Sequence, residues 1–204
     1  DSPKKYFDLY RNTSKVPRHY IPYYAAISQF DDIVGNLVNY VEGKGLAENT
    51  LFIFVVENGW TPSTQRHKTQ KNFFHHTGVS KRAPFEDGLR TPILFRWDKH
   101  ITPAQHELLC SSVDIAPTLL HLTGQSKKAK ALPGINLLDR ATRKRNADRA
   151  VFGEIYPGDA TSLGHPSRHV AYRWVRQANF KLIIPQGNKP WGNYLNKPAL
   201  FNLA

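Results

Sequence analysis

The sequence feature that most constrains the fold is the apolar run from Thr50 to Glu57, which is rich in β-branched and aromatic residues and shows no polar alternation. Such a run is typical of a strand buried on both faces of a parallel sheet. Between Tyr23 and Leu46, apolar side chains recur every three or four positions, which predicts an amphipathic helix. A helix, a tight connection and a buried strand together predict a layered α/β fold.

The rest of the chain predicts a second strand, a second helix and a small sheet. Residues 91–97 are a strand candidate, and Ser111 or Ser112 is expected to cap a helix that ends at Gly124. After residue 150, short strand-like pieces alternate with Gly, Pro and Asn turns, which favours an antiparallel sheet. We therefore expect a partial α/β/α sandwich (helix, buried strand, helix) followed by a small antiparallel sheet subdomain. The expected regions are a basic surface arm at 1–22, the α/β part at 23–125, a basic connector at 126–149 and the β subdomain at 150–204.

Charge narrows the set of partners. The 204 residues hold 28 Lys and Arg against 16 Asp and Glu, a formal net charge of +12. Such a surplus attracts polyanions, whether nucleic acid, anionic membranes or sulfated and carboxylated polysaccharides. The basic stretch at 126–149 lacks the interleaved aromatic residues that would indicate stacking on single-stranded nucleic acid, which disfavours nucleic acid as the partner. No apolar run approaches the roughly 18 residues of a membrane span.

The cysteine and methionine content adds two expectations. Cys110 is the only cysteine, which excludes an internal disulfide framework and a cysteine-rich zinc site. We expect it to pack as a small apolar side chain. The chain begins at Asp1 and contains no Met, which indicates that it was processed or cut from a longer protein.

Two segments carry side chains suited to binding an anion. Glu57, Asn58 and Gly59 follow directly on the predicted buried strand, and ligands of open α/β sheets bind at that edge. The segment SKRAPFEDGLRTP, residues 80–92, places a lysine, two acids, a glycine and an arginine in one tight turn. A lysine there can direct its charge at an anionic group held by the sheet edge. Alternatively, Glu86 and Arg90 form a local ion pair that only fixes the turn.

Other polar side chains could bind a metal ion or have a different role. His67, His75 and His76 lie in a polar loop where zinc is conceivable, but adjacent histidines without a third spaced ligand more often face solvent or substrate. We therefore predict substrate contact for His75 and His76. Asp31 and Asp32 look like a carboxylate pair, but neighbours on a helix point about 100° apart. A structural role is expected for them.

Five blocks, in this order and spacing, resemble the carboxyl-terminal half of the type I sulfatases, a family within the alkaline-phosphatase superfamily. The resemblance covers nearly the whole chain from about Tyr23. The blocks are YYAAISQFDDIVGNLVNYVEGKGLAENTLFIFVVENGW, SKRAPFEDGLRTPILFRW, SVDIAPTLLHLTG, LPGINLLD and a late YRWVRQANFKLI followed by ALFNL.

The resemblance implies roles for several residues. Glu57 and Asn58 stand where the family has an Asp and an Asn that help to hold a calcium ion, Glu57 being one methylene longer than the family's Asp. Hard oxygen donors suit such an ion. Lys81 matches the family's lysine, which contacts the sulfate ester and stabilises charge on its oxygens. Arg90 matches an arginine with a mainly structural role.

The resemblance also implies what this chain lacks. The family's nucleophile is a formylglycine made from a cysteine or serine of a C-x-P-S-R type motif, which is absent from these residues. The paired acids that complete the calcium site belong to the amino-terminal half, which is the expected partner of this chain. We therefore expect a periplasmic or secreted sulfatase that hydrolyses sulfate esters, with sulfated glycans as one substrate class. The chain alone is expected to be inactive.

Two alternatives stay open. One is a related hydrolase of phosphate or phosphonate esters, because the metal at the sheet edge is shared across the superfamily. The other is a non-catalytic module that binds polyanions, in which Glu57 marks a decayed metal site.

Overall fold

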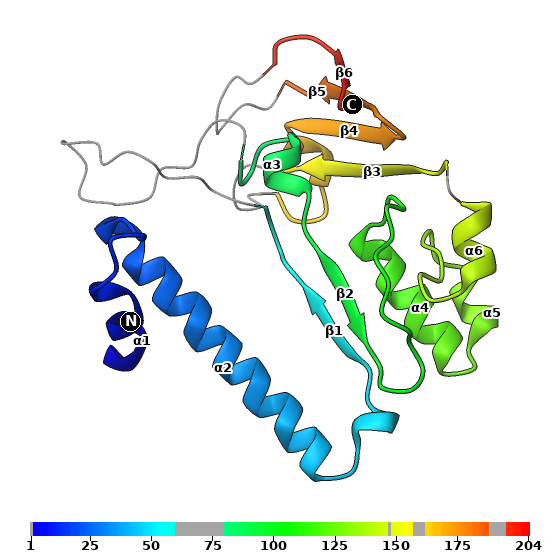
Figure 1. Cartoon of the computed structure of the whole chain (residues 1–204). Coiled ribbons are helices and arrows are strands. Elements are labelled where there is room, and N and C mark those ends of the chain that lie inside the picture. Colours follow the sequence, from blue (N-terminus) through cyan, green and yellow to red (C-terminus); the bar gives the residue numbers. More distant parts are fainter. Residues whose placement is uncertain (1, 60–79, 147, 157–161, 188–194) are drawn as a thin grey trace. The chain divides into compact units, whose positions relative to one another are not determined.

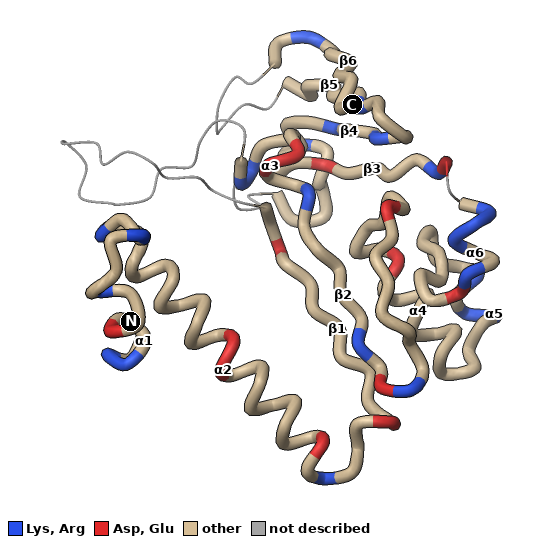
Figure 2. Tube along the Cα trace, in the orientation of Figure 1, with Lys and Arg blue, Asp and Glu red and all other residues tan. Residues whose placement is uncertain are grey.

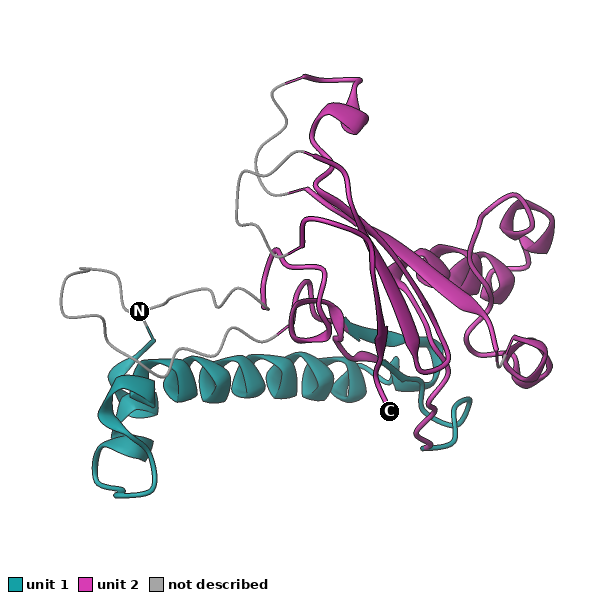
Figure 3. Cartoon of the chain, turned by 90° about the horizontal axis from the view of Figure 1, so that it is seen from above, with its two compact units in different colours: residues 1–54, 94–103 teal, residues 55–93, 104–204 magenta. Residues whose placement is uncertain are grey.

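The computed structural model describes residues 2–59, 80–146, 148–156, 162–187 and 195–204 (Figure 1). The chain divides into two compact units (Figure 3). The first unit comprises residues 1–54 and 94–103, and the second comprises residues 55–93 and 104–204. Each unit is described by itself.

A long helix organises the first unit. Its helical segments are α1 (Lys4–Arg11), η1 (Arg18–Tyr20), α2 (Ile21–Gly43) and η2 (Ala47–Asn49). The segment 1–22, expected to be an arm without periodic structure, thus contains α1. Its anchor is Tyr6, which is buried and donates a hydrogen bond from its hydroxyl to Asp32 at 2.8 Å. This bond is the main reason that the pKa of Asp32 is lowered, and it gives Asp32 the structural role expected of it.

The chain leaves the first unit along one short strand and returns to it along another. β1 (Phe52–Val55) and β2 (Ile93–Arg96) form a two-stranded sheet and run in opposite directions (Figure 1). The expectation of a parallel sheet that buries β1 on both faces is therefore wrong for the described residues: β1 is half-buried, and Val55 is exposed. An apolar run predicts that a strand is buried, but the tertiary structure decides which elements bury it and how far.

The helices of the second unit are short, and the last of them, α6, is rich in Lys and Arg residues (Figure 2). The helix expected after Ser111 is confirmed, because Ser111 and Asp114 form a capping box at its start. Gly124 follows this helix with a φ of 76°, a left-handed value that glycine adopts without strain. Within the described part of the chain, no helix is long and apolar enough to cross a membrane. The helical elements are α3 (Glu86–Leu89), η3 (Ser112–Asp114), α4 (Ile115–Leu122), α5 (Ser126–Ala129) and α6 (Arg140–Arg145).

Asp114, the residue directly before α4, binds the segment that follows this helix. It is fully buried, and its carboxylate accepts hydrogen bonds from the backbone N–H groups of Ser111 at 2.8 Å and Ile135 at 2.9 Å. Arg149 donates from Nη1 at 2.9 Å, with only 12% of its side chain exposed. We call Asp114 and these three partners the Asp114 cluster. The segment 126–149, expected as a solvated connector, is therefore held in place by buried contacts.

The carboxyl-terminal part forms the expected antiparallel sheet. Its strands pair in the order β3-β4-β5-β6, each antiparallel to its neighbour (Figure 1). Phe85 and Leu89, which flank and end α3, pack on the sheet's core residues Ile155, Tyr172 and Ile183. This sheet is consequently the surface on which α3 rests. Its strands are β3 (Ala150–Ile155), β4 (Tyr172–Gln177), β5 (Phe180–Pro185) and β6 (Ala199–Asn202), with the turn η4 (Pro166–Arg168) between β3 and β4.

Candidate functional site

The residues after β1 lie against α3. Glu57 is exposed and Asn58 is half-buried, and the N–H of Gly59 donates a hydrogen bond to the carbonyl oxygen of Gly88 at 2.9 Å. A Cβ at Gly59 would come within 2.1 Å of the carbonyl oxygen of Asp87. Since no side chain fits at that distance, glycine is required where the strand end contacts α3.

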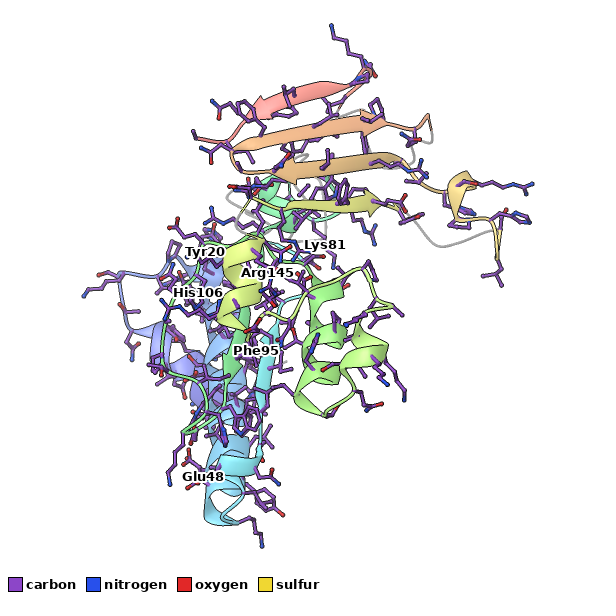
Figure 4. The ribbon with its side chains drawn as sticks, turned by 90° about the vertical axis from the view of Figure 1, so that its right-hand side faces the viewer. Tyr20, Glu48, Lys81, Phe95, His106 and Arg145 are labelled. Carbon is purple, nitrogen blue, oxygen red and sulfur yellow. The ribbon has the colours of Figure 1, made fainter. Side chains whose placement is uncertain are left out.

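The turn that carries Lys81 contacts the same short helix. Ser80 is fully buried, and its carbonyl oxygen accepts a hydrogen bond from the N–H of Ala83 at 2.9 Å. A Cβ at Gly88 would come within 2.3 Å of that carbonyl oxygen. Lys81 itself is half-buried on the segment leading into α3 (Figure 4). The fold thus brings the strand end and the Lys81 turn to one helix, α3, through two close glycine contacts.

Glu86, the first residue of α3, belongs to an ion cluster that the sequence reading did not identify. Its Oε1 accepts a hydrogen bond from Lys181 Nζ at 2.8 Å, and its Oε2 pairs with Arg176. The proposed local pair of Glu86 with Arg90 is therefore replaced by two partners on the sheet; Arg90 is exposed, and its backbone N–H donates to the carbonyl oxygen of Glu86 at 2.8 Å. We call Glu86, Arg176, Lys181 and the adjoining Trp174 the Glu86 cluster.

Lys181 is the most unusual member of this cluster, because only 1% of the residue is exposed. Burial lowers the pKa of its ammonium group, and the hydrogen bond to Glu86 partly opposes that shift. Its Nζ also lies 4.6 Å from the centre of the Trp174 ring, a favourable cation–π position. The signal in the sequence was a lysine between apolar residues in a predicted strand, at a position that turns out to face inward.

The remaining expected residues are placed differently. His75 and His76, as well as His67, lie outside the described residues. Cys110 is exposed, so the expectation that it packs as an apolar side chain is wrong.

Among the described residues, no three or more His, Cys, Asp or Glu side chains gather in a way that could hold a metal ion. Glu57 and Asn58 contribute oxygen donors of the type that Ca²⁺ prefers, but Ca²⁺ takes about six to eight such ligands. They therefore fit as part of a calcium site. Asn58 also donates from Nδ2 to the carbonyl oxygen of Gly59 at 3.1 Å, which fixes its side chain beside the strand end.

Solved structures share this fold. One described in connection with the metabolism of multiple glycosaminoglycans by Bacteroides thetaiotaomicron matches with a TM-score of 0.66 and 21% sequence identity. The match covers 99% of this chain and 43% of that chain. At this identity the likeness shows the α/β architecture and the appended antiparallel sheet, which confirms the expected fold class.

Sequence comparisons identify the family. The sulfatase family model matches residues 1–125. Human N-acetylgalactosamine-6-sulfatase is 30% identical over 153 residues, and human arylsulfatase A is 32% identical over 144 residues. These matches cover 74% and 70% of this chain, but only 28% of each human protein. The chain belongs to the sulfatase family, and it spans under a third of the length of these relatives.

Proposed function

We propose that these residues form part of the sulfate-binding site of a sulfatase that hydrolyses sulfate esters. The observation that carries this proposal is the meeting of the strand end at Gly59 and the Lys81 turn on α3. A carboxylate, an amide and an ammonium group are thereby supplied by two segments that touch the same helix. Such a set suits an anion that is bound partly by a cation and partly by a lysine.

Within this site, Glu57 and Asn58 would hold part of a calcium ion, which when bound supplies positive charge that polarises sulfate oxygens. The other metal ligands and the formylglycine nucleophile would come from residues outside this chain. These 204 residues contain no C-x-P-S-R type motif. We therefore expect no turnover from the chain by itself.

Lys81 would orient the sulfate group and stabilise negative charge as it develops on the ester oxygens. The excess of basic residues supports the approach of an anionic substrate, since a net charge of +12 steers anions toward the protein. Such steering weakens as salt screens the field.

Sulfated sugars are the substrate class we favour. The human relative named N-acetylgalactosamine-6-sulfatase is similar over 74% of this chain. The structural neighbour from Bacteroides is described in connection with glycosaminoglycans. The positive charge of the present chain agrees with a polyanionic glycan.

The test is an assay of the complete natural polypeptide that contains these residues, using an aryl sulfate and the matching aryl phosphate. Lys81→Ala is expected to lower sulfate ester turnover about 100- to 1,000-fold. Lys127→Ala, which removes an exposed lysine from α5, is the control and should retain activity. Full activity of Lys81→Ala would contradict the role of Lys81, and faster phosphate than sulfate turnover would favour a phosphate ester hydrolase.

A further inference from the structure

The helix that joins the two halves of the candidate site is too short to hold its own position. α3 has four residues, Glu86–Leu89, whereas isolated helices shorter than about 12 residues are unstable in water. Its position must therefore come from outside the helix. Two sets of contacts provide it: Phe85 and Leu89 pack on the sheet core, and Glu86 binds Arg176 and Lys181.

The ion pairs of Glu86 fix the orientation of α3 more strictly than its apolar contacts do, because they join particular atoms. Arg176 on β4 and Lys181 on β5 are direct partners in the strand register, so two positive side chains stand opposite each other on the inward face. Such a pair is unfavourable unless an anion separates the charges. Glu86 meets this need because each of its carboxylate oxygens binds one of the two cations.

Movement of α3 would be transmitted to the Lys81 turn. Gly88 packs directly against the backbone of Ser80, because a Cβ at Gly88 would come within 2.3 Å of the carbonyl oxygen of Ser80. Ser80 directly precedes Lys81 in the sequence. The N–H of Gly59 is bound to the carbonyl oxygen of Gly88, so the strand end is linked to the same point. Closely packed backbone has no slack to absorb a displacement.

We propose that Glu86 is a positioning residue: by binding Arg176 and Lys181 it fixes α3 to the four-stranded sheet and thereby sets the position of Lys81. This inference rests on the proposed role of Lys81 in sulfate binding. It gives the carboxyl-terminal sheet a part in the reaction through the position of Lys81.

The activity test is a double-mutant cycle in the complete natural polypeptide. Glu86→Gln should lower kcat/KM per folded molecule roughly tenfold or more, because a small misplacement of a catalytic group is costly. In a Lys81→Ala background the same substitution should change activity by less than about twofold, since its effect passes through Lys81. Equal losses in both backgrounds would overturn the proposal.

The matched control is Glu154→Gln on the same sheet. Glu154 pairs with Arg173 at 2.9 Å, but both side chains are exposed, at 38% and 53%. The substitution Glu154→Gln removes one negative charge, as Glu86→Gln does, but from a part of the sheet away from the contacts with α3. We expect it to leave kcat/KM unchanged in both backgrounds, and a loss equal to that of Glu86→Gln would overturn the positioning role.

Hydrogen exchange tests the positioning independently of the reaction. In Glu86→Gln, the amides of Gly59 and Ala83 should exchange about tenfold faster, while those of the β3–β4 pairing keep their protection. Unchanged exchange at Gly59 and Ala83 would overturn the proposal even if the protein is a sulfatase. Conversely, full activity of Lys81→Ala would remove the proposed function while the exchange result still stands.

A second variant covers the case in which Glu86→Gln does not fold. Glu86→Gln combined with Lys181→Met removes the buried charge that the single substitution leaves without its partner. This double variant still lacks the carboxylate bridge, so it should show the same faster exchange and the same dependence on Lys81. Wild-type exchange and activity in the folded double variant would also overturn the proposal.

Discussion

Asp114 and Glu86 both connect segments that are far apart in the sequence, but they do so with different partners. Asp114 is fully buried and accepts two backbone N–H groups as well as Arg149, 35 residues away. Glu86 has a quarter of its side chain exposed and binds two side-chain cations, 90 and 95 residues away.

This difference in partners indicates that Asp114 stabilises the fold, whereas Glu86 also positions the candidate site. Its two backbone donors hold Asp114 in one local geometry, since without the carboxylate these half-buried N–H groups would lose their partner. Glu86 instead holds a helix turn against a sheet, and that turn touches the segments carrying Asn58 and Lys81. We therefore expect loss of Asp114 to act mainly on stability and loss of Glu86 to act on both stability and activity.

The largest effect on stability is expected for Asp114→Ala. It leaves Arg149 almost buried without its partner and removes the acceptor of two backbone N–H groups. Breaking a buried pair in this way costs about 3–5 kcal/mol in the free energy of unfolding. Urea unfolding followed by circular dichroism measures it, and Asp8→Asn, at an exposed pair with Lys4, serves as the control with no measurable change.

The same variant tests the contrast between the clusters. Molecules of Asp114→Ala that remain folded should keep wild-type exchange at the Gly59 amide. A strongly faster exchange there would show that the Asp114 cluster also positions the site, and the distinction between the two clusters would be lost.

A smaller loss of stability is expected for Glu86→Gln. Lys181 then stays buried without a negative partner, but Arg176 has 21% of its side chain exposed and can be solvated. We estimate a loss of about 2–3 kcal/mol, below that of Asp114→Ala, because partial exposure weakens the pair. Unfolding of both variants under the same conditions gives the order, and the reverse order would contradict the burial argument.

A still smaller change is expected for Lys181→Met. It replaces a buried ammonium by an apolar side chain of similar length, while Glu86 keeps Arg176. Removing one partner of a buried pair is costly when it leaves a charge uncompensated, which Arg176 prevents here, so we expect a change within about 1 kcal/mol. A loss as large as that of Glu86→Gln in urea unfolding would mean that Lys181, rather than the carboxylate, holds α3 in place.

The smallest effect concerns Asp139, a half-buried acid whose described hydrogen bonds come from its own helix. It caps α6 by accepting hydrogen bonds from Ala141 N at 3.3 Å and Thr142 N at 2.8 Å. Its pKa is lowered, first by the hydrogen bond from the Thr142 side chain. Because its folded pKa lies below the ordinary value of 3.8, its contribution is present above that value and is lost as the pH falls through the folded pKa.

Amide exchange or NMR of α6 between neutral pH and the acid range measures this effect. We expect the first turn of α6 to loosen at low pH, and Asp139→Asn to remove most of the pH dependence. The Asp114 and Glu86 clusters should not respond to Asp139→Asn, and a response there would contradict the local role of this cap.

Local patterns were sufficient for much of the fold. The capped helix at Ser111, the helix before the first strand and the small antiparallel sheet were expected and are present. The segments around Asn58 and Lys81 were also chosen from the sequence as candidates, and their roles stay predictions. Capping, turn chemistry and hydrophobic periodicity involve residues only a few positions apart, which is why a single sequence reveals them.

Pairing over long distances was decided by the tertiary structure alone. Glu86 had Arg90 as its sequence neighbour, but the register of β4 and β5 placed Arg176 and Lys181 within its reach. The burial of Lys181, the partners of Asp114 and the exposure of Cys110 likewise depend on which elements come to lie together. The sequence by itself thus determined several elements, the family and the candidate residues, whereas the helices α1, α3 and α6 were not expected. The tertiary structure determined their partners, because charge pairing and burial depend on position in space, which short-range patterns do not encode.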